Sequence, residues 1–169
     1  YSATGKGIAM TRVKLDDADI RILAVLQEDA ALSIAEVALR VNLSHNACWR
    51  RMTRLKEVGV ITRRVTLLDA NALGLDLTVF VSIRAAEHSD EWLKKLTAAI
   101  NEIPEVVEFY RMTGDVDYLL KLRVESMAAY DMVYRRLIGA VRLSDVSASF
   151  SMEEIKCTTA LPLKRTPPA

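Results

Sequence analysis

The sequence has few residues that could build a disulfide framework, a metal site or a catalytic centre. Its two cysteines, Cys48 and Cys157, lie far apart and form no CxxC pair, which fits a reducing cytosol better than a disulfide scaffold. Nothing brings its two histidines, His45 and His88, together. It also lacks a Ser-His-Asp or Cys-His set, an HExxH motif and a Gly-rich phosphate loop. We therefore expect no enzyme, no catalytic residue, no metal ligand and no cofactor.

Long apolar runs are missing as well. No run could span a bilayer, and the N-terminus lacks the apolar region of a signal peptide. We therefore expect a cytoplasmic protein with no membrane partner. The chain starts with Tyr1 rather than Met. We therefore expect residues 1–13 to be disordered or in part not native to the protein, with Met10 as the natural start. The tail 164–169, which contains Pro167 and Pro168, should be frayed.

What the sequence has is enough apolar material for a core and an uneven distribution of charge. The 169 residues are 51% hydrophobic, which allows one domain or two small ones. The formal net charge is only +1. Residues 1–66 hold 11 Lys and Arg against 7 Asp and Glu, a net charge of +4, whereas residues 67–169 hold 12 against 15, a net charge of −3. A basic N-terminal module should precede an acidic C-terminal one.

The segment from Ser33 to Glu57, SIAEVALRVNLSHNACWRRMTRLKE, predicts two short helices joined by a tight turn. Ser33 and Glu36 have the spacing of a capping box, which predicts the start of the first helix. Ser44 offers an N-cap for the second helix. Such a pair of helices is typical of a helix-turn-helix, whose second helix lies in the major groove of DNA.

The second helix should bury Cys48, Met52 and Leu55 and expose a basic face. On that face Arg can donate two hydrogen bonds to guanine, and Asn can pair with adenine. Arg51 and Lys56 lie nearer the flanks and suit phosphates. The residues that we expect to contact DNA are Ser44, His45, Asn46, Trp49, Arg50, Arg51, Thr53 and Arg54.

Less specific interpretations of the same residues stay open. Charge alone would fit a solvated basic helix in an ordinary helical domain equally well, and the capped two-helix unit favours DNA binding. His45 could be an exposed bystander, and Trp49 could pack on the preceding helix. Cys48 fits a small buried hydrophobe better than a redox sensor.

Two elements should flank this unit. The pattern from Lys14 to Glu28 predicts a helix with Asp16 as N-cap, Asp19 in its first turn, and Ile20, Leu23 and either Leu26 or Gln27 facing inward. Residues 61–68 are rich in β-branched side chains and should form a short wing or connecting strand. Its Arg63 and Arg64 either contact phosphates or keep a solvent-exposed edge strand from pairing with another strand. We therefore expect a winged helix-turn-helix domain at 14–68.

Beyond a turn-rich linker at 69–75, the periodicity changes and predicts a second domain at 76–163. Alternating apolar residues and helical patterns give the order β, α, β, β, α, β, in the segments 77–83, 89–103, 106–112, 116–124, 126–138 and 146–157. This order is that of a ferredoxin-like domain, an antiparallel sheet with both helices on one face. The fold class is therefore α+β. A second copy of the sheet could cover the open face.

Four segments in this order resemble the Lrp/AsnC (feast/famine) family of transcription regulators. They are LDDADIRILAVLQEDA, NLSHNACWRRMTRLKEVGVI, MTGDVDYLLKLRV and SFSMEEIK, and the resemblance runs from about Lys14 to Leu163. It implies a DNA-binding regulator whose second domain binds a free amino acid. It also implies a homodimer that assembles into a tetramer or octamer, with the effector between dimers.

The resemblance implies an effector site at the hairpin around Gly114, approached by the last strand. Asp115 and Asp117 could bind the ammonium of an amino acid, and the glycine lets its carboxylate approach the backbone. Arg111 stands where many relatives have an apolar residue, and it could pair with Asp115 or close the pocket. The implied effector residues are Arg111, Met112, Thr113, Gly114, Asp115, Asp117, Ser149, Phe150 and Ser151. The alternative is that both aspartates only fix the turn.

Two further expectations concern the signal and the class of protein. The segments NACWRR, HSDEW and SFSMEEIKCTTALP resemble a sub-branch with a cysteine-responsive detoxification regulator, which makes cysteine one candidate effector. The alternative to a regulator is an amino-acid-binding metabolic sensor, similar to an ACT domain, that does not bind DNA. The basic N-terminal module argues against that alternative.

Overall fold

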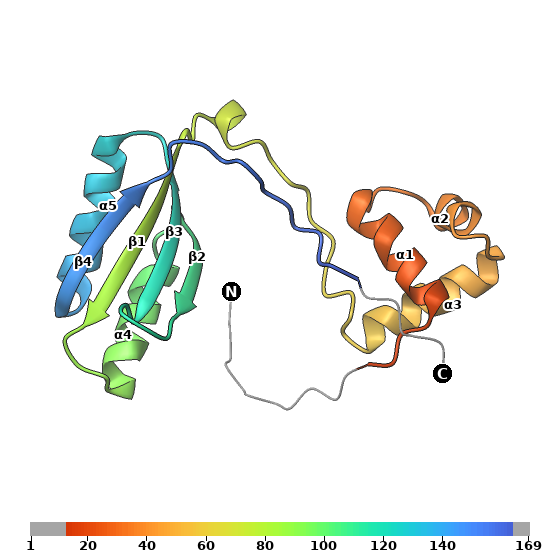
Figure 1. Cartoon of the computed structure of the whole chain (residues 1–169), viewed down its shortest axis with the longest axis horizontal. Helices are drawn as coiled ribbons and strands as arrows, with labels where there is room; N and C mark the ends of the chain where they lie inside the picture. Colours follow the sequence, from red (N-terminus) through yellow and green to blue (C-terminus); the bar gives the residue numbers. More distant parts are fainter. Residues whose placement is uncertain (1–12, 164–169) are drawn as a thin grey trace. The chain divides into compact units, whose positions relative to one another are not determined.

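The computed structural model describes residues 13–163, so the expectations for the N-terminal segment before residue 13 and for the tail 164–169 lie outside it. The described chain forms two compact units (Figure 1). The first contains residues 13–66 together with 156–163, and the second is Leu67–Ile155. The C-terminal segment therefore groups with the helical unit, whereas the sequence placed everything up to residue 163 in the second domain.

The helical unit consists of α1 (Asp17–Glu28), α2 (Ile34–Arg40) and α3 (His45–Glu57). Each helix begins at a side-chain cap. Asp16 with Asp19 and Ser33 with Glu36 form capping boxes, and the Ser44 hydroxyl accepts a hydrogen bond from the backbone N–H of Ala47 at 3.3 Å. The predicted helix starts are confirmed.

The core of this unit lies between the three helices and confirms the predicted inner face of α3. Cys48, Met52 and Leu55 are buried. In α1 the prediction was wrong at one position, because Ile22 is fully buried and Ile20 is half-buried. The buried side of α1 runs through Asp19, Ile22 and Leu23, at the spacing that places residues on one helix face.

The predicted wing is absent from the described residues. After α3 the chain turns at Gly59, whose φ is +75°, and residues 61–68 continue without forming a strand. The pattern of β-branched residues predicted a strand, but a strand needs a neighbour to pair with its backbone groups, and the strand pairs of the described residues do not include this segment. The linker contains one 3₁₀ turn, η1 (Asn71–Leu73).

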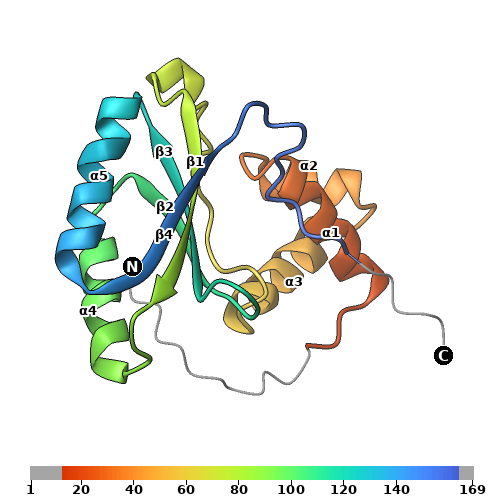
Figure 2. The same cartoon turned by 60° about the vertical axis from the view of Figure 1, so that its left-hand side comes forward.

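The second unit has the predicted element order. It contains β1 (Leu77–Ala85), α4 (Asp90–Asn101), β2 (Val106–Arg111), β3 (Tyr118–Val124), α5 (Met127–Ala140) and β4 (Leu143–Phe150). The strands form one antiparallel sheet in the order β2-β3-β1-β4, and Figure 2 shows α4 and α5 on the same side of it. The ferredoxin-like arrangement and the α+β class are confirmed.

The core of the second unit lies between the helices and the inner face of the sheet. Val79, Val81 and Ile83 of β1 are fully buried and stand in register with Leu122, Leu120 and Tyr118 of β3. Apolar residues alternate along β1 in the sequence because one face of this strand lies in the core. The opposite face carries Phe80, which is 37% exposed.

The last strand ends earlier than predicted. The sequence predicted a strand over 146–157, but β4 ends at Phe150, and one further hydrogen bond joins Ser151 N–H to the Thr78 carbonyl at 2.9 Å. Because β1 begins at Leu77, the residues after Ser151 have no strand to pair with. The chain instead continues to the helical unit, where Leu163 packs against the core.

Candidate functional site

The outer side of α3 is the first candidate site. Of the eight residues predicted to contact DNA, Ser44, His45, Asn46, Trp49 and Arg50 are exposed, and Arg51, Thr53 and Arg54 are half-buried. The exposed residues all belong to the N-terminal part of α3 or its cap, which is the part of a recognition helix that meets base edges. Within residues 13–163 the structure gives the Arg50 side chain no ion pair.

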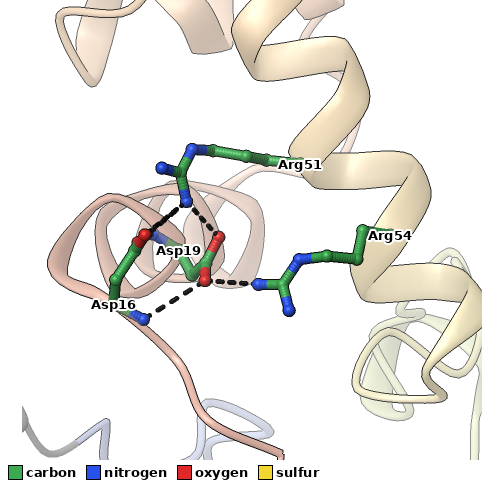
Figure 3. Close-up of polar contacts among 4 residues, drawn as sticks. All are labelled: Asp16, Asp19, Arg51 and Arg54. Carbon is green, nitrogen blue, oxygen red and sulfur yellow. Dashed lines mark hydrogen bonds and ion pairs between the residues drawn. The ribbon is translucent and has the colours of Figure 1, made fainter.

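The half-buried arginines of α3 are held by two carboxylates of α1 (Figure 3). Arg51 Nη1 lies 2.9 and 2.7 Å from the two oxygens of Asp16 and 2.8 Å from Asp19 Oδ1. Arg54 Nη2 donates to Asp19 Oδ2. The side chain of Asp19 is only 1% exposed, so it is a buried carboxylate with two cationic partners. These ion pairs tie the start of α1 to the middle of α3.

The ionisation of this cluster follows from its hydrogen bonds. The backbone N–H of Asp19 and the guanidinium of Arg51 lower the pKa of Asp16. Hydrogen bonds to Asp16 and Asp19 raise the pKa of Arg51. Both groups are therefore charged at neutral pH, and the charges of two arginines and two aspartates balance.

Sequence reasoning assigned Asp16 and Asp19 only to the start of α1 and did not find this cluster. A signal was available, because Asp16 and Asp19 are three residues apart and so are Arg51 and Arg54, which puts each pair on one helix face. An open pocket lies beside the cluster. It is lined by Lys14, Asp16, Asp19, Leu43, Ala47, Arg50, Arg51 and Arg54.

The hairpin between β2 and β3 is the second candidate site, and Asp117 fixes its geometry. The Asp117 carbonyl accepts from the backbone N–H of Met112 at 2.8 Å, and its own N–H donates to the Ile83 carbonyl at 3.0 Å. Its carboxylate accepts from the backbone N–H of Ala85 at 2.8 Å. The carboxylate of Asp117 thus has a structural partner, as the turn-fixing alternative requires. His88 Nε2 lies 4.0 Å from the other carboxylate oxygen.

Arg84 is a hairpin residue that the sequence did not reveal. Its Nε donates to the backbone carbonyl of Asp115 at 2.7 Å, which fastens the tip of the hairpin to the end of β1. Gly114 in this tip has a φ of +116°, a value that favours glycine. The carboxylate of Asp115 is exposed and has no partner among residues 13–163 that the structure shows. No local pattern marks Arg84, because its contact spans 31 residues.

The remaining predicted effector residues do not converge on the hairpin within one chain. Ser149 and Phe150 pair with Phe80 and Val79, near the start of β1, whereas the hairpin is bonded to Ile83, Arg84 and Ala85 at its end. The span from Thr78 to Arg84 corresponds to about 20 Å of strand. Ser149, Phe150 and Ser151 therefore do not reach the hairpin of their own chain, and the predicted site, with the effector between dimers, stays a prediction.

The structure shows the neighbours of two predicted effector residues within their own chain. Phe150 packs edge-on against Tyr130 of α5, with ring centroids 5.2 Å apart. Arg111 ends β2 opposite Tyr118 and is exposed, and in the described part of the chain it forms no ion pair with Asp115. Met112, Thr113 and Gly114 are exposed at the hairpin.

Among residues 13–163, no group of three or more His, Cys, Asp or Glu side chains could hold a metal ion. No helix in this part of the chain has the length and apolar character needed to cross a membrane.

Comparison with known proteins identifies the class of both domains. The family model described as the Lrp/AsnC ligand binding domain matches residues 78–161, and that of a winged helix-turn-helix DNA-binding domain matches residues 15–62. The glutamate uptake regulatory protein of Zymomonas mobilis is 56% identical over 153 residues, which cover 90% of this chain and 93% of that protein.

Two solved structures share the fold. An AsnC family transcriptional regulator from Agrobacterium tumefaciens has a TM-score of 0.84 and 53% identity, and the match covers 88% of this chain and 97% of that one. A transcriptional regulator from Neisseria meningitidis in complex with L-methionine has a TM-score of 0.84 and 33% identity, with the same coverage. None of these three names mentions cysteine, so they give the cysteine suggestion no support.

These matches decide between the classes of function. Because a DNA-binding domain and a ligand-binding domain match the same chain, the alternative of an amino-acid sensor that does not bind DNA does not hold. The two solved relatives are transcriptional regulators, and the chain, which matches a DNA-binding and a ligand-binding domain, is not an enzyme. The chain belongs to the Lrp/AsnC family of DNA-binding transcriptional regulators.

Proposed function

We propose that this regulator reads its operator with the exposed N-terminal part of α3 and that a free amino acid controls how copies of the protein engage DNA. The observation that carries the first part is the position of Asn46 and Arg50 on the exposed face of α3, next to buried Cys48. The buried side fixes the helix in the unit, so the opposite side is free to enter a groove.

The predicted contact residues divide into two groups in this proposal. Asn46, Trp49 and Arg50 face the bases, because they are exposed on the outer side of α3. The others contact or support the flanking phosphates: Ser44 and His45 at the N-terminus of α3, where backbone N–H groups favour anions, and Arg51, Thr53 and Arg54 further along it.

Arg50→Ala tests this interface. If Arg50 donates two hydrogen bonds to guanine, the variant should lose about 1–3 kcal/mol of binding free energy on the operator and much less on random DNA. Lys56→Ala is the control, because an exposed phosphate contact should weaken binding on both DNAs alike. Equal losses of Arg50→Ala on both DNAs would make Arg50 a phosphate contact and remove it from base recognition.

The effector site in this proposal is formed by two copies of the chain. Arg111–Asp115 and Asp117 come from the hairpin of one copy, and Ser149, Phe150 and Ser151 come from another, because the two sets lie at opposite ends of β1. The exposed carboxylate of Asp115 suits the ammonium group of an amino acid. A relative solved with L-methionine supports an amino acid as the class of effector.

The control mechanism follows from a site shared between copies. An effector that prefers one assembly of dimers, as a tetramer or octamer, shifts the population toward it and so changes how many α3 helices bind DNA together. Dimers would form through the open face of the sheet. We place this function in the cytoplasm.

A thermal-shift screen against the twenty amino acids, with methionine, glutamate and cysteine first, tests the effector site. A ligand that binds only the folded protein raises its apparent stability. We expect at least one hit that Asp115→Ala abolishes, and light scattering should show a change of assembly with that ligand. No hit at millimolar concentration would overturn the effector site. A hit that changes DNA affinity but not the assembly would overturn the control mechanism.

A further inference from the structure

The Asp16–Asp19–Arg51–Arg54 cluster changes how much positive charge α3 offers to DNA. In sequence, α3 carries Arg50, Arg51, Arg54 and Lys56 and a single acidic residue, Glu57. In the structure, two of these four basic side chains already have carboxylate partners from α1. The surface that faces DNA is therefore less basic than the sequence of α3 suggests.

The two carboxylates are not equivalent. The side chain of Asp19 is 1% exposed and contacts both arginines, and a buried carboxylate that lost its cationic partners would strongly destabilise the fold. The side chain of Asp16 is 56% exposed and contacts only Arg51. An exposed ion pair is weak and exchangeable. Asp19 is therefore a fixed partner, whereas Asp16 can be replaced.

A DNA phosphate is the group that could replace Asp16. Both Asp16 oxygens lie within 2.9 Å of Arg51 Nη1, so the carboxylate occupies a position that the oxygens of a phosphate could take. The side chain of Arg51 is 32% exposed, and it lines the same open pocket as Arg50 and Lys14. A phosphate entering this pocket would compete with Asp16 for Arg51.

We propose that Asp16 is a specificity-determining residue that limits binding to nonspecific DNA by competing with phosphates for Arg51, while Asp19 positions both arginines. This inference rests on the proposed use of α3 at the DNA. Nonspecific affinity comes almost entirely from phosphate contacts, whereas operator affinity also includes base contacts. In this proposal the base contacts of the operator hold α3 in place long enough for a phosphate to displace Asp16 from Arg51, whereas random DNA lacks those contacts and leaves Asp16 bound. Asp16 therefore lowers the affinity for random DNA more than the affinity for the operator.

The salt dependence of binding reports this competition. Each phosphate contact contributes a slope of about −0.9 to a plot of log affinity against log salt concentration. If Asp16 keeps Arg51 from phosphates on random DNA, its removal should add one contact there. We expect Asp16→Asn to tighten binding to random duplex DNA by about three- to tenfold and to steepen the slope by about one.

Asp16→Asn has a matched control in Asp17→Asn. Asn is as good an N-cap as Asp, so the first variant keeps the start of α1. Asp17 is the next residue, lies exposed in the first turn of the same helix and has no ion pair in the part of the chain that the structure describes. Both variants change the net charge equally. Only Asp16→Asn removes a partner of Arg51.

The experiment measures the affinity of the full-length protein and both variants for a random 30-bp duplex and for an operator selected from a random library, from about 50 to 300 mM salt. We expect Asp16→Asn, but not Asp17→Asn, to reduce the ratio of operator affinity to random affinity. The same change made in an Arg51→Gln background should have no effect. Circular dichroism verifies that each variant is folded.

Three results would overturn the inference. They are equal effects of Asp16→Asn and Asp17→Asn on random DNA, weaker binding of random DNA by Asp16→Asn, and an Asp16→Asn effect that persists in the Arg51→Gln background. A failure of the α3 interface itself is distinguishable, because Arg50→Ala would then leave affinity for both DNAs unchanged. The salt slope of Asp16→Asn against Asp17→Asn decides the question even if Arg51→Gln is unstable.

Discussion

The side-chain amide of Gln27 in α1 forms two hydrogen bonds with the backbone of Leu161, which lies 134 residues later in the chain. Gln27 Nε2 donates to the Leu161 carbonyl at 3.2 Å, and Gln27 Oε1 accepts from the Leu161 N–H at 2.6 Å. Leu163 packs against the core of the same unit. The segment that follows β4 is thus fixed to the DNA-binding unit, so two chain segments join the two units.

Gln27→Leu should release this segment, because leucine has a similar size but can form neither hydrogen bond. We expect the free energy of unfolding of the helical unit to fall by about 1–2 kcal/mol. Urea unfolding measures the loss, and hydrogen exchange of the Leu161 amide should become faster.

Glu28→Leu is the control for Gln27→Leu, because Glu28 is the exposed neighbour on the same helix. It should change the unfolding free energy by less than about 0.5 kcal/mol. Unchanged exchange at the Leu161 amide in Gln27→Leu would show that the two hydrogen bonds do not hold the segment.

The sequence predicted those features that depend on neighbouring residues. The capping boxes at Asp16 and Ser33 join residues three apart, and the buried positions of β1 alternate along one strand. Patterns between residues that are close in sequence can be recognised without knowing the fold. Such patterns therefore located the five α-helices and four strands of the described residues, although they extended β4 too far and also predicted a wing that is absent there.

Features that depend on distant residues could not be predicted in this way. The end of β4 depends on where β1 begins, and the partners of Arg51 lie 32 and 35 residues away. The effector residues were taken from a family pattern, which names positions but not the chain that supplies them. The register of β4 with β1 shows that one chain cannot bring both sets together.

The two hairpin aspartates should behave differently when each is changed to alanine. Asp117→Ala removes the acceptor for the Ala85 N–H and should lower the unfolding free energy by about 1–2 kcal/mol. Asp115→Ala removes an exposed carboxylate and should change it by less than about 0.5 kcal/mol.

Chemical unfolding of the two aspartate variants, followed by the amino-acid thermal-shift assay, separates folding from binding. Asp115→Ala should unfold like the original protein and yet lose its response to the effector. If Asp115→Ala retained that response in full, the proposed role of its carboxylate in binding the ammonium group would be wrong.

Gly114→Ala tests the backbone of the hairpin alone. At Gly114 φ is +116°, and a Cβ atom placed there would meet no atom within 4 Å apart from those of the glycine and its two chain neighbours. The free-energy cost of the substitution therefore comes from the backbone conformation and not from clashes with the surroundings. We expect a loss of about 1–2 kcal/mol in unfolding free energy. The control is Gly139→Ala in α5, where a Cβ atom also meets nothing within 4 Å.

In Gly139→Ala the backbone is helical, and alanine should stabilise the protein by about 0.5–1 kcal/mol. The two substitutions therefore have opposite expected signs in the same unfolding assay. A gain of stability in Gly114→Ala would mean that the hairpin backbone adapts without strain.

The pH dependence of unfolding tests the ion pair between Asp16 and Arg51. The hydrogen bond from the Asp19 N–H and the Arg51 guanidinium lower the pKa of Asp16 in the folded state. A lowered pKa means that the folded state favours the charged carboxylate, so its contribution to stability is fully present above the unfolded pKa, about 3.9. That contribution is lost as the pH falls through the lower, folded value. Asp16→Asn should therefore lose less stability than the original protein between about pH 5 and pH 2.

Urea unfolding at several pH values measures this difference for Asp16→Asn. Asp17→Asn has the same change of charge but keeps every contact of the cluster, so its acid-induced loss of stability should match that of the original protein. High salt should reduce the difference, because the Asp16 side chain is 56% exposed and the pair is screened. Parallel pH curves for Asp16→Asn and the original protein would show that Arg51 does not stabilise the charged form of Asp16. In that case the competition with DNA phosphates would also lose its physical basis.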